Sequence, residues 1–281
     1  MISDDLRTEP CSHEGLDFWD GERPARGVRG VYSTDLLRRR AVEIIEGHDP
    51  SRPLFLYLAF QSPHAPLQAP EEYVERYSYV EDPNRRKYLG MVTAMDDAVG
   101  SVVDSLKKAG LWNDTVFVFT TDNGGQPLRG GNNFPLRGAK NTLWEGGTRA
   151  VAFVSSVLIP KSYVNRRLIH AVDWFPTLVH LAGGDSNGSS IDGVNQWEAI
   201  AHNKAAIRKE FVYNLRMEGD LLSGAIRVGI HKLILGDPGK PDNWIPPPRR
   251  KYRKLPRTAI TKILNSPAIL MRFVQQCCTI P

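Results

Sequence analysis

Apolar residues recur along this chain with two spacings, one typical of helices and one typical of buried strands. Steps of three and four residues, which place apolar side chains on one helix face, occupy residues 34–46, 88–108 and 173–182. Apolar runs rich in β-branched and aromatic residues, which are typical of strands, occupy residues 54–60, 115–121 and 149–156. The first of these is apolar on both faces, as a central parallel strand is. The runs at 211–215 and 225–235 predict a smaller terminal sheet.

The alternation of strands and helices predicts an α/β fold with a mainly parallel sheet flanked by helices. The helix over 88–108 is the clearest element, because Lys107 and Lys108 lie in its last turn and Gly110 follows it. Asp96 and Asp97 on this helix could form a catalytic carboxylate pair. Their spacing instead indicates a solvated helix face.

The strand over 115–121 ends in Asp122 and Asn123, followed by two glycines. Asn-Gly is a strong signal for a tight hairpin turn. The glycine-rich segment 126–133 that follows contains no returning strand, which favours a different interpretation. Ligands of open α/β sheets lie beyond the carboxyl ends of strands, and carboxylate and amide oxygens suit hard cations. We therefore expect a metal site at Asp122 and Asn123.

The net charge of +5 comes from the end of the chain. Residues 249–281 contain eight Lys or Arg and no Asp or Glu, so the preceding residues are slightly acidic. A basic tail can contact anionic glycans, membranes or nucleic acid, and more often it is a solvated segment. No nucleic-acid-binding motif accompanies it, no apolar run could span a membrane, and the N-terminus has no signal-peptide core.

Several segments together resemble a type I sulfatase, most closely the arylsulfatase B (N-acetylgalactosamine-4-sulfatase) branch. The resemblance extends over about residues 16 to 250 and rests on seven segments. They are TDNGG at 121–125, LRGAK at 136–140, LWEGGTR at 143–149, FLYLAFQSPHAPLQAPEEY at 55–73, YLGMVTAMDDAVGSVVDSLKKAGLWNDTVF at 88–117, HAVDWFPTLVHLAGG at 170–184 and, more weakly, AIRVGIHKLILGDPG at 225–239.

The resemblance implies an alkaline phosphatase/sulfatase-like fold and a boundary between domains. Residues 1–205 would form the later part of the sulfatase α/β domain, and residues 206–252 part of a small C-terminal antiparallel subdomain. Residues 253–281 would be a basic tail outside the resemblance. The missing beginning of the family pattern makes us expect a fragment of a longer protein.

The resemblance also implies Ca²⁺-dependent hydrolysis of sulfate esters on N-acetylgalactosamine-type glycans. Asp122 and Asn123 match two of the family's calcium ligands, while Lys140 and His64 match its sulfate-contacting lysine and histidine. Glu145 and Arg137 lie in the same motifs, and we interpret both as structural residues that position the loop.

The chain departs from the family at the nucleophile, a formylglycine made from the cysteine of a Cys-x-Pro-Ser-Arg motif. None of the three cysteines lies in such a motif: Ser-His-Glu follows Cys11, and Thr-Ile-Pro follows the pair Cys277-Cys278. Asp4-Asp5 does not replace the family's first calcium-binding pair, because no strand precedes it. We therefore expect the chain as printed to be inactive alone.

Two glycosylation sequons begin at Asn113 and Asn187. They are consistent with the lysosomal or secreted location that the family implies. Two other functions stay open: a non-catalytic protein that binds sulfated glycans, and a metal-dependent phosphatase or phosphodiesterase of the same superfamily. The oligomeric state is not indicated by any of these patterns.

Overall fold

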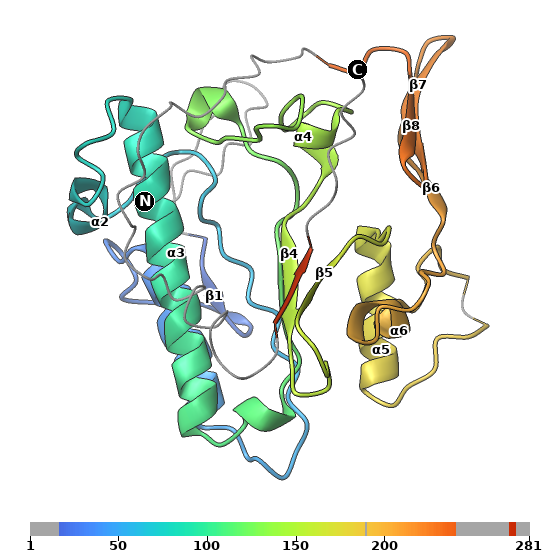
Figure 1. The fold of residues 1–281 in the computed structure, drawn as a ribbon. Coiled ribbons are helices and arrows are strands. Elements are labelled where there is room, and N and C mark those ends of the chain that lie inside the picture. The colour runs from blue at the N-terminus through green and yellow to red at the C-terminus, as the bar shows by residue number, and fades with distance from the viewer. Residues whose placement is uncertain (1–16, 189, 240–269, 274–281) are drawn as a thin grey trace. The chain divides into compact units, whose positions relative to one another are not determined.

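The computed structural model describes residues 17–188, 190–239 and, for the backbone alone, 270–273 (Figure 1). The described chain divides into two compact units. The first contains residues 17–113 and 128–131, and the second contains 114–127, 132–239 and the strand 270–273. Short 3-10 helices occupy Trp112–Asp114, Pro127–Arg129 and Ala171–Asp173.

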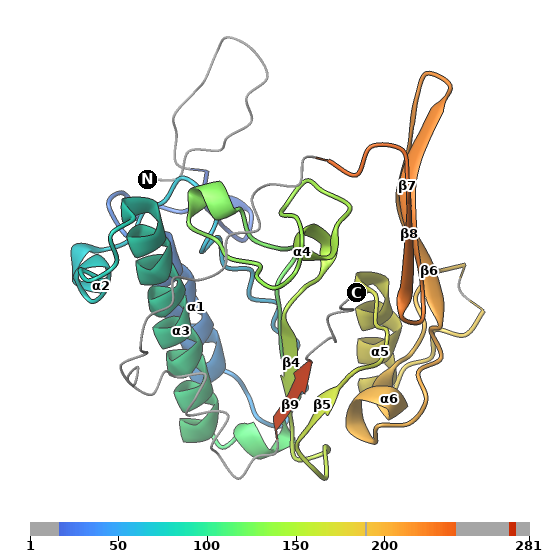
Figure 2. The same cartoon turned by 45° about the horizontal axis from the view of Figure 1, so that its top comes forward.

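Helices dominate the first unit, which also has a short hairpin of β1 (Trp19–Asp20) and β2 (Arg23–Pro24). Its helices are α1 (Ser33–Glu46), α2 (Glu71–Glu75) and α3 (Pro83–Lys108). Both α1 and α2 pack against α3 (Figure 2). Asp82 caps the N-terminus of α3, because its side chain accepts a hydrogen bond from the Arg85 amide at 2.8 Å. The sequence-based predictions of α1 and α3 are confirmed.

The acidic pair on α3 is divided between its two faces. Asp97 is exposed, and its Oδ2 lies 3.6 Å from Arg76 Nη1. Asp96 is buried, with 5% of its surface exposed. Neighbouring helical positions are rotated by about 100°, so the two carboxylates point in different directions. The prediction of a solvated face was therefore right for Asp97 and wrong for Asp96.

Residues 54–60 do not form the predicted central strand. The segment carries no strand assignment, and no described strand is paired with it. Its side chains alternate between partly buried and exposed positions, with Phe55 and Tyr57 exposed by 75% and 82%. Apolar sequence favours extended backbone, but a sheet requires a neighbouring strand that takes up its hydrogen bonds.

The second unit contains a four-stranded sheet in the order β3-β4-β9-β5, of which β4, β9 and β5 are labelled in Figure 2. Its strands are β3 (Phe117–Thr120), β4 (Ala152–Ser155), β9 (Leu270–Phe273) and β5 (Tyr163–Asn165). The β5–β9 pairing is parallel, whereas β3–β4 and β4–β9 are antiparallel. The α/β fold class is confirmed, while this described sheet is mixed and not mainly parallel. The sheet is mixed because the chain that leaves β3 returns as β4, which pairs antiparallel with β3.

A separate antiparallel sheet follows, made of β6 (Glu210–Glu218), β7 (Leu221–Val228) and β8 (His231–Leu235). The apolar run 225–235, predicted as one stretch, is two strands here. The chain turns at Gly229, whose φ of +54° lies in the left-handed region that glycine adopts without steric cost. The proposed subdomain boundary at residue 206 stays a prediction, although this sheet begins close to it.

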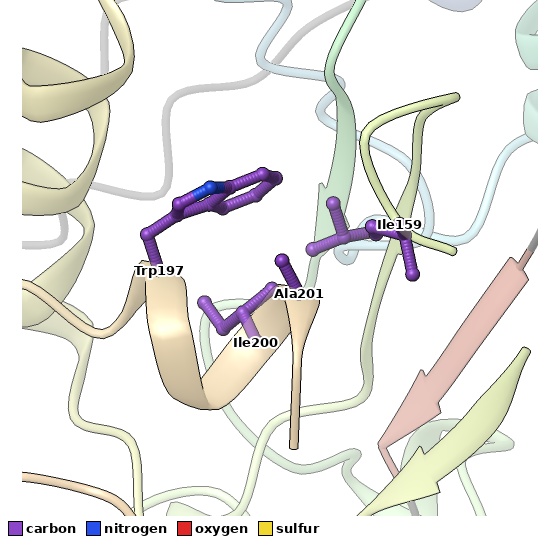
Figure 3. Close-up of a cluster of buried hydrophobic side chains, with 5 residues drawn as sticks. Ile159, Trp197, Ile200 and Ala201 are labelled. Carbon is purple, nitrogen blue, oxygen red and sulfur yellow. The ribbon is translucent and has the colours of Figure 1, made fainter. Parts of the chain in front are cut away.

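The core of the second unit lies between β4 and the short helix α6 (Trp197–Ala201). Trp197, Ile200 and Ala201 from α6 gather beside Ile159, as Figure 3 shows, and Val154 of β4 completes the cluster. All five are at most 7% exposed. This apolar burial is the main source of stability for the unit.

A charged anchor, defined as the pair Asp173 and Arg208, fixes helix α5 (Trp174–Leu181) within the same unit. The Arg208 guanidinium donates to both carboxylate oxygens of Asp173 at distances of 2.6–3.0 Å. The amides of His170 and Val194 donate to the same carboxylate. Asp173 is 1% exposed, so these contacts replace its hydration.

Burial by itself would raise the pKa of Asp173, but these hydrogen bonds outweigh it and hold the pKa below the usual value. The pKa of Arg208 is raised, chiefly by the hydrogen bonds to Asp173. Burial, helped by the positive charge of Arg208, lowers the pKa of His170. The anchor therefore consists of a carboxylate and a guanidinium that both stay charged beside a neutral imidazole.

Candidate functional site

The connection between β3 and β4, residues 121–151, carries most of the predicted site and is called the site loop here. Both ends of the loop are fixed at the sheet. The Thr121 amide donates to the Val151 carbonyl at 2.9 Å, and the Val151 amide donates to Thr121 Oγ1 at 2.9 Å. The Asp122-Asn123-Gly124 sequence thus begins a long loop between the antiparallel strands β3 and β4 and does not form a tight hairpin turn.

Asp122 and Asn123 lie directly beyond the end of β3, as the sequence predicts. Asp122 Oδ1 accepts a hydrogen bond from the Asn123 amide at 2.8 Å, and its side chain is exposed. Asn123 Nδ2 donates to the Gly124 carbonyl at 2.8 Å. That bond uses Nδ2 as the donor, so Oδ1 is the acceptor atom that this side chain could offer to a cation.

Lys140 contacts Gly125, which follows this strand end, although fifteen positions separate the two residues in sequence. The Lys140 amide donates to the Gly125 carbonyl at 3.2 Å, and the Lys140 side chain is partly buried. The turn after Lys140 contains Asn141 with a φ of +70°. Thr142 Oγ1 donates to the Ala139 carbonyl at 2.7 Å and closes that turn.

Glycines allow the segments of the site loop to approach each other closely. The Gly124 amide donates to the Gly147 carbonyl at 3.0 Å, and the Gly146 amide donates to the Arg137 carbonyl at 2.7 Å. A Cβ atom at Gly124 would overlap the Gly146 carbonyl oxygen. The glycines of TDNGG and LWEGG are therefore required where their backbones touch.

The β6–β8 sheet holds the segment after Lys140 through Glu145. Glu145 Oε1 lies 2.9 Å from Lys232 Nζ and 3.3 Å from Arg227 Nη1. Lys232 and Arg227 are nearly buried, with side chains only 11% and 10% exposed. Tyr213 adds a hydrogen bond from its hydroxyl to the Leu143 carbonyl at 3.1 Å.

The other charged residue of these motifs, Arg137, stacks over the Trp144 ring with its guanidinium carbon 3.9 Å from the ring centroid. Both Arg137 and Glu145 thus contact protein groups within the loop region. These contacts agree with the interpretation of the two residues as structural.

His64 belongs to the first unit and is exposed in its loop. Its Nδ1 lies 2.6 Å from the Ala65 carbonyl oxygen. A carbonyl can only accept, so Nδ1 carries a proton and Nε2 is the accepting nitrogen of the neutral ring. The nearby Ser62 hydroxyl is held by Thr34 Oγ1 at 2.7 Å and the Tyr32 hydroxyl at 3.1 Å, which fixes the loop to the start of α1.

Asp122 and Asn123 fit part of a calcium site and do not complete one. Ca²⁺ takes six to eight oxygen ligands, and these side chains provide one carboxylate and one amide oxygen. Within residues 17–239, apart from the undescribed position 189, no group of three or more His, Cys, Asp or Glu side chains could hold a metal. Further ligands would have to come from backbone oxygens, water or residues outside the described chain.

The asparagines of both glycosylation sequons, Asn113 and Asn187, are exposed, as glycan attachment requires. Cys11, Cys277 and Cys278 lie outside the described residues. No described helix is long and apolar enough to cross a membrane.

The sulfatase family profile matches residues 5–184, which is more than half of the chain. The matched range contains the site loop, His64 and α5. The chain therefore belongs to the sulfatase family. The expected family is confirmed by this match, whereas the narrower arylsulfatase B assignment is not.

Among curated proteins, the chain is 40% identical to mouse (Mus musculus) arylsulfatase J over 252 residues. That alignment covers 83% of this chain and 42% of the relative. Human N-acetylgalactosamine-6-sulfatase is 29% identical over 205 residues, with 71% and 37% covered. The chain thus spans less than half the length of these relatives.

Among solved structures, Ps i-CgsB is 32% identical with a TM-score of 0.65, over 73% of this chain and 46% of that one. The complex of Ps i-CgsB with k-i-k-neocarrahexaose matches with 31% identity, a TM-score of 0.64 and the same coverage. The sulfatase fold, with its alkaline phosphatase-like α/β architecture, is thereby confirmed for the matched part.

Proposed function

We propose that this chain provides the sulfate-contacting lysine and part of the calcium site of a sulfatase that hydrolyses sulfate esters of N-acetylgalactosamine-type glycans. The observation that carries the proposal is the hydrogen bond from the Lys140 amide to the Gly125 carbonyl. It joins the loop of the cationic residue to the strand end that bears Asp122 and Asn123.

Sulfate ester hydrolysis accumulates negative charge on the sulfate oxygens and on the departing alcohol oxygen. Lys140 would bind the sulfate and stabilise that charge as a compact cation with three donors. The family resemblance also assigns a sulfate contact to His64, an exposed residue of the first unit whose Nδ1 proton is donated to the Ala65 carbonyl. Asp122 and Asn123 would hold the cation. Bound Ca²⁺ would neutralise sulfate charge.

The narrower substrate assignment rests on the motifs LRGAK and LWEGGTR, which resemble the arylsulfatase B branch. A glycan substrate is also supported by Ps i-CgsB, whose structure was solved with a bound neocarrahexaose. The proposed location is lysosomal or secreted, and the exposed Asn113 and Asn187 sequons are consistent with it.

The test is binding of a chondroitin 4-sulfate tetrasaccharide to the 281-residue chain, measured by calorimetry with and without Ca²⁺. Removing a charge-assisted contact by Lys140→Met should weaken binding about tenfold. Lys161→Met, which changes an exposed lysine of the same unit, is the matched control. Asp122→Asn should weaken Ca²⁺ binding. Equal binding of the sulfated and desulfated tetrasaccharides would contradict the proposal.

A second candidate function is the binding of sulfated glycans without hydrolysis by the printed 281 residues, which contain no Cys-x-Pro-Ser-Arg motif. We expect the chain as printed to bind the tetrasaccharide and to leave a chromogenic aryl sulfate intact. Clear turnover that Lys140→Ala abolishes would show that the chain is an enzyme by itself.

A further inference from the structure

We propose that Asn133 is a positioning residue that holds Lys140 beside the end of β3 that carries Asp122 and Asn123. The proposal deepens the proposed function and rests on it. Asn133 lies in the site loop between the two segments that carry the candidate ligands, and it belongs to none of the motifs that carry the family resemblance.

The Asn133 side chain forms three hydrogen bonds, all to backbone atoms of the site loop. Its Oδ1 accepts from the Gly125 amide at 2.9 Å, and its Nδ2 donates to the Gly125 carbonyl at 2.9 Å. The same Nδ2 donates to the Gly138 carbonyl at 3.0 Å. Both polar groups of Gly125 are thus paired with one side chain, as they would be with a neighbouring strand.

These bonds reach both sides of the candidate site. Gly125 follows Asn123 by two positions, and Gly138 precedes Lys140 by two positions. The Gly125 carbonyl also accepts from the Lys140 amide. Because Asn133, Lys140 and Gly125 share this one carbonyl, a shift of Asn133 would move the lysine relative to Asp122 and Asn123.

The chemistry of the contact requires an amide at this position. An aspartate has the same shape and keeps the acceptor, but it loses both donated hydrogen bonds. Its negative charge would also face the carbonyl oxygens of Gly125 and Gly138, which repel it. Asn133→Asp is therefore a nearly isosteric change that removes the positioning contacts.

The neighbouring Asn132 offers a matched control. Its Oδ1 accepts from the Phe134 amide at 2.8 Å, a contact that an aspartate preserves, and its side chain is exposed. Asn132→Asp therefore adds the same charge one position away without removing the recorded hydrogen bond. Any effect of net charge on anion binding should be equal in the two variants.

The experiment uses the 281-residue chain and measures the hydrogen-exchange rate of the Lys140 amide and the affinity for chondroitin 4-sulfate tetrasaccharide. Asn133→Asp should accelerate exchange at Lys140 and weaken tetrasaccharide binding about tenfold, the usual scale for unpaired polar groups. Asn132→Asp should leave exchange at Lys140 unchanged and weaken binding only slightly.

Asn133→Ala distinguishes the loss of the positioning contacts from the effect of an introduced charge. It removes all three side-chain hydrogen bonds without adding a charge. It should therefore accelerate exchange at Lys140 and weaken tetrasaccharide binding in the same direction as Asn133→Asp.

Two results would overturn the positioning role: unchanged Lys140 exchange in Asn133→Asp, or equal losses of affinity in the two aspartate variants. Exchange in α5 reports whether a variant has unfolded, and Asn133→Ala then decides the question at Lys140. If the natural chain does not bind the tetrasaccharide, the proposed function fails, while Lys140 exchange still decides whether Asn133 holds the loop.

Discussion

The site loop and the charged anchor both join distant segments of the second unit, but they use different contacts. In the site loop, Asn133 and the glycines bond to backbone atoms with neutral groups. In the anchor, the buried carboxylate of Asp173 is balanced by Arg208 and by backbone amides. The comparison separates two ways of fixing a fold, one through shape and neutral hydrogen bonds and the other through charge.

The difference has a functional consequence for the proposed sulfatase. In the proposed function, Asp122 and Lys140 of this loop bind a cation and a sulfate. The contacts between Gly125, Asn133 and Lys140 use uncharged groups, which do not compete for those ligands, whereas Glu145 further along the loop pairs with Lys232 and Arg227. The anchor has no such constraint and can use a strong ion pair.

The largest expected effect comes from removing the charge of the anchor. Asp173→Asn leaves the Arg208 guanidinium without its buried partner and should lower the free energy of unfolding by about 3–5 kcal/mol. Urea denaturation monitored by circular dichroism measures this change. Glu198→Gln, which removes the exposed pair with Lys204, is the control and should leave stability nearly unchanged. Equal effects of the two substitutions would contradict a special role for burial.

The next largest effect should come from the close backbone contact in the site loop. Gly124→Ala places a methyl group against the Gly146 carbonyl and should cost about 2–3 kcal/mol. Urea denaturation and hydrogen exchange in the site loop measure the change. Gly47→Ala is the control, since its methyl group would lie 3.2 Å from the Glu43 carbonyl. A similar cost at both glycines would indicate that the contact in the site loop relaxes easily.

Acid should weaken the anchor and spare the hydrogen bonds of the site loop. The folded-state pKa of Asp173 is lowered, so its contribution is complete above the unfolded value of 3.8 and is lost as pH falls through the folded pKa. The lowered pKa of His170 acts in the same direction below 6.5. The free energy of unfolding should therefore decrease with acidification, and Asp173→Asn should reduce the decrease below pH 3.8. Chemical denaturation at several pH values measures both effects.

The smallest effect is expected at Glu145, where charged residues support the site loop from the β6–β8 sheet. Glu145→Gln keeps the side-chain shape and one acceptor and should cost about 1 kcal/mol. Hydrogen exchange at residues 143–148 should increase more than exchange at residues 122–125. Glu218→Gln removes the exposed pair with Arg216 and is the control, for which no change is expected in either segment.

Local patterns in the sequence were sufficient to predict the helices α1, α3 and α5 and the strand end that carries Asp122 and Asn123. Apolar spacing and capping residues predicted α1 and α3, because these signals act within a few turns of one helix. The motif TDNGG predicted a strand end carrying Asp122 and Asn123. The roles of these residues and of Lys140 and His64 stay predictions.

Contacts between distant segments were not visible in the sequence. The return of β4 to pair with β3, the exposure of Phe55 and the burial of Asp96 each depend on which other segment is present. No motif in the sequence distinguished Asn133 within the glycine-rich segment 126–133. The doublet Asn132-Asn133 gave no signal that one side chain bonds locally while the other joins two segments.

The sequence by itself determined the family and the helices α1, α3 and α5, and it predicted residues suited to bind a sulfate and a hard cation. Those features depend on residue chemistry and on spacing over a few positions. Only the tertiary structure decided that Gly125 forms hydrogen bonds with both Asn133 and Lys140. The same is true of the ion pairs of Glu145 with Lys232 and Arg227. Such contacts join residues far apart in the chain, and they form only after packing has overcome the entropy of closing the intervening loops.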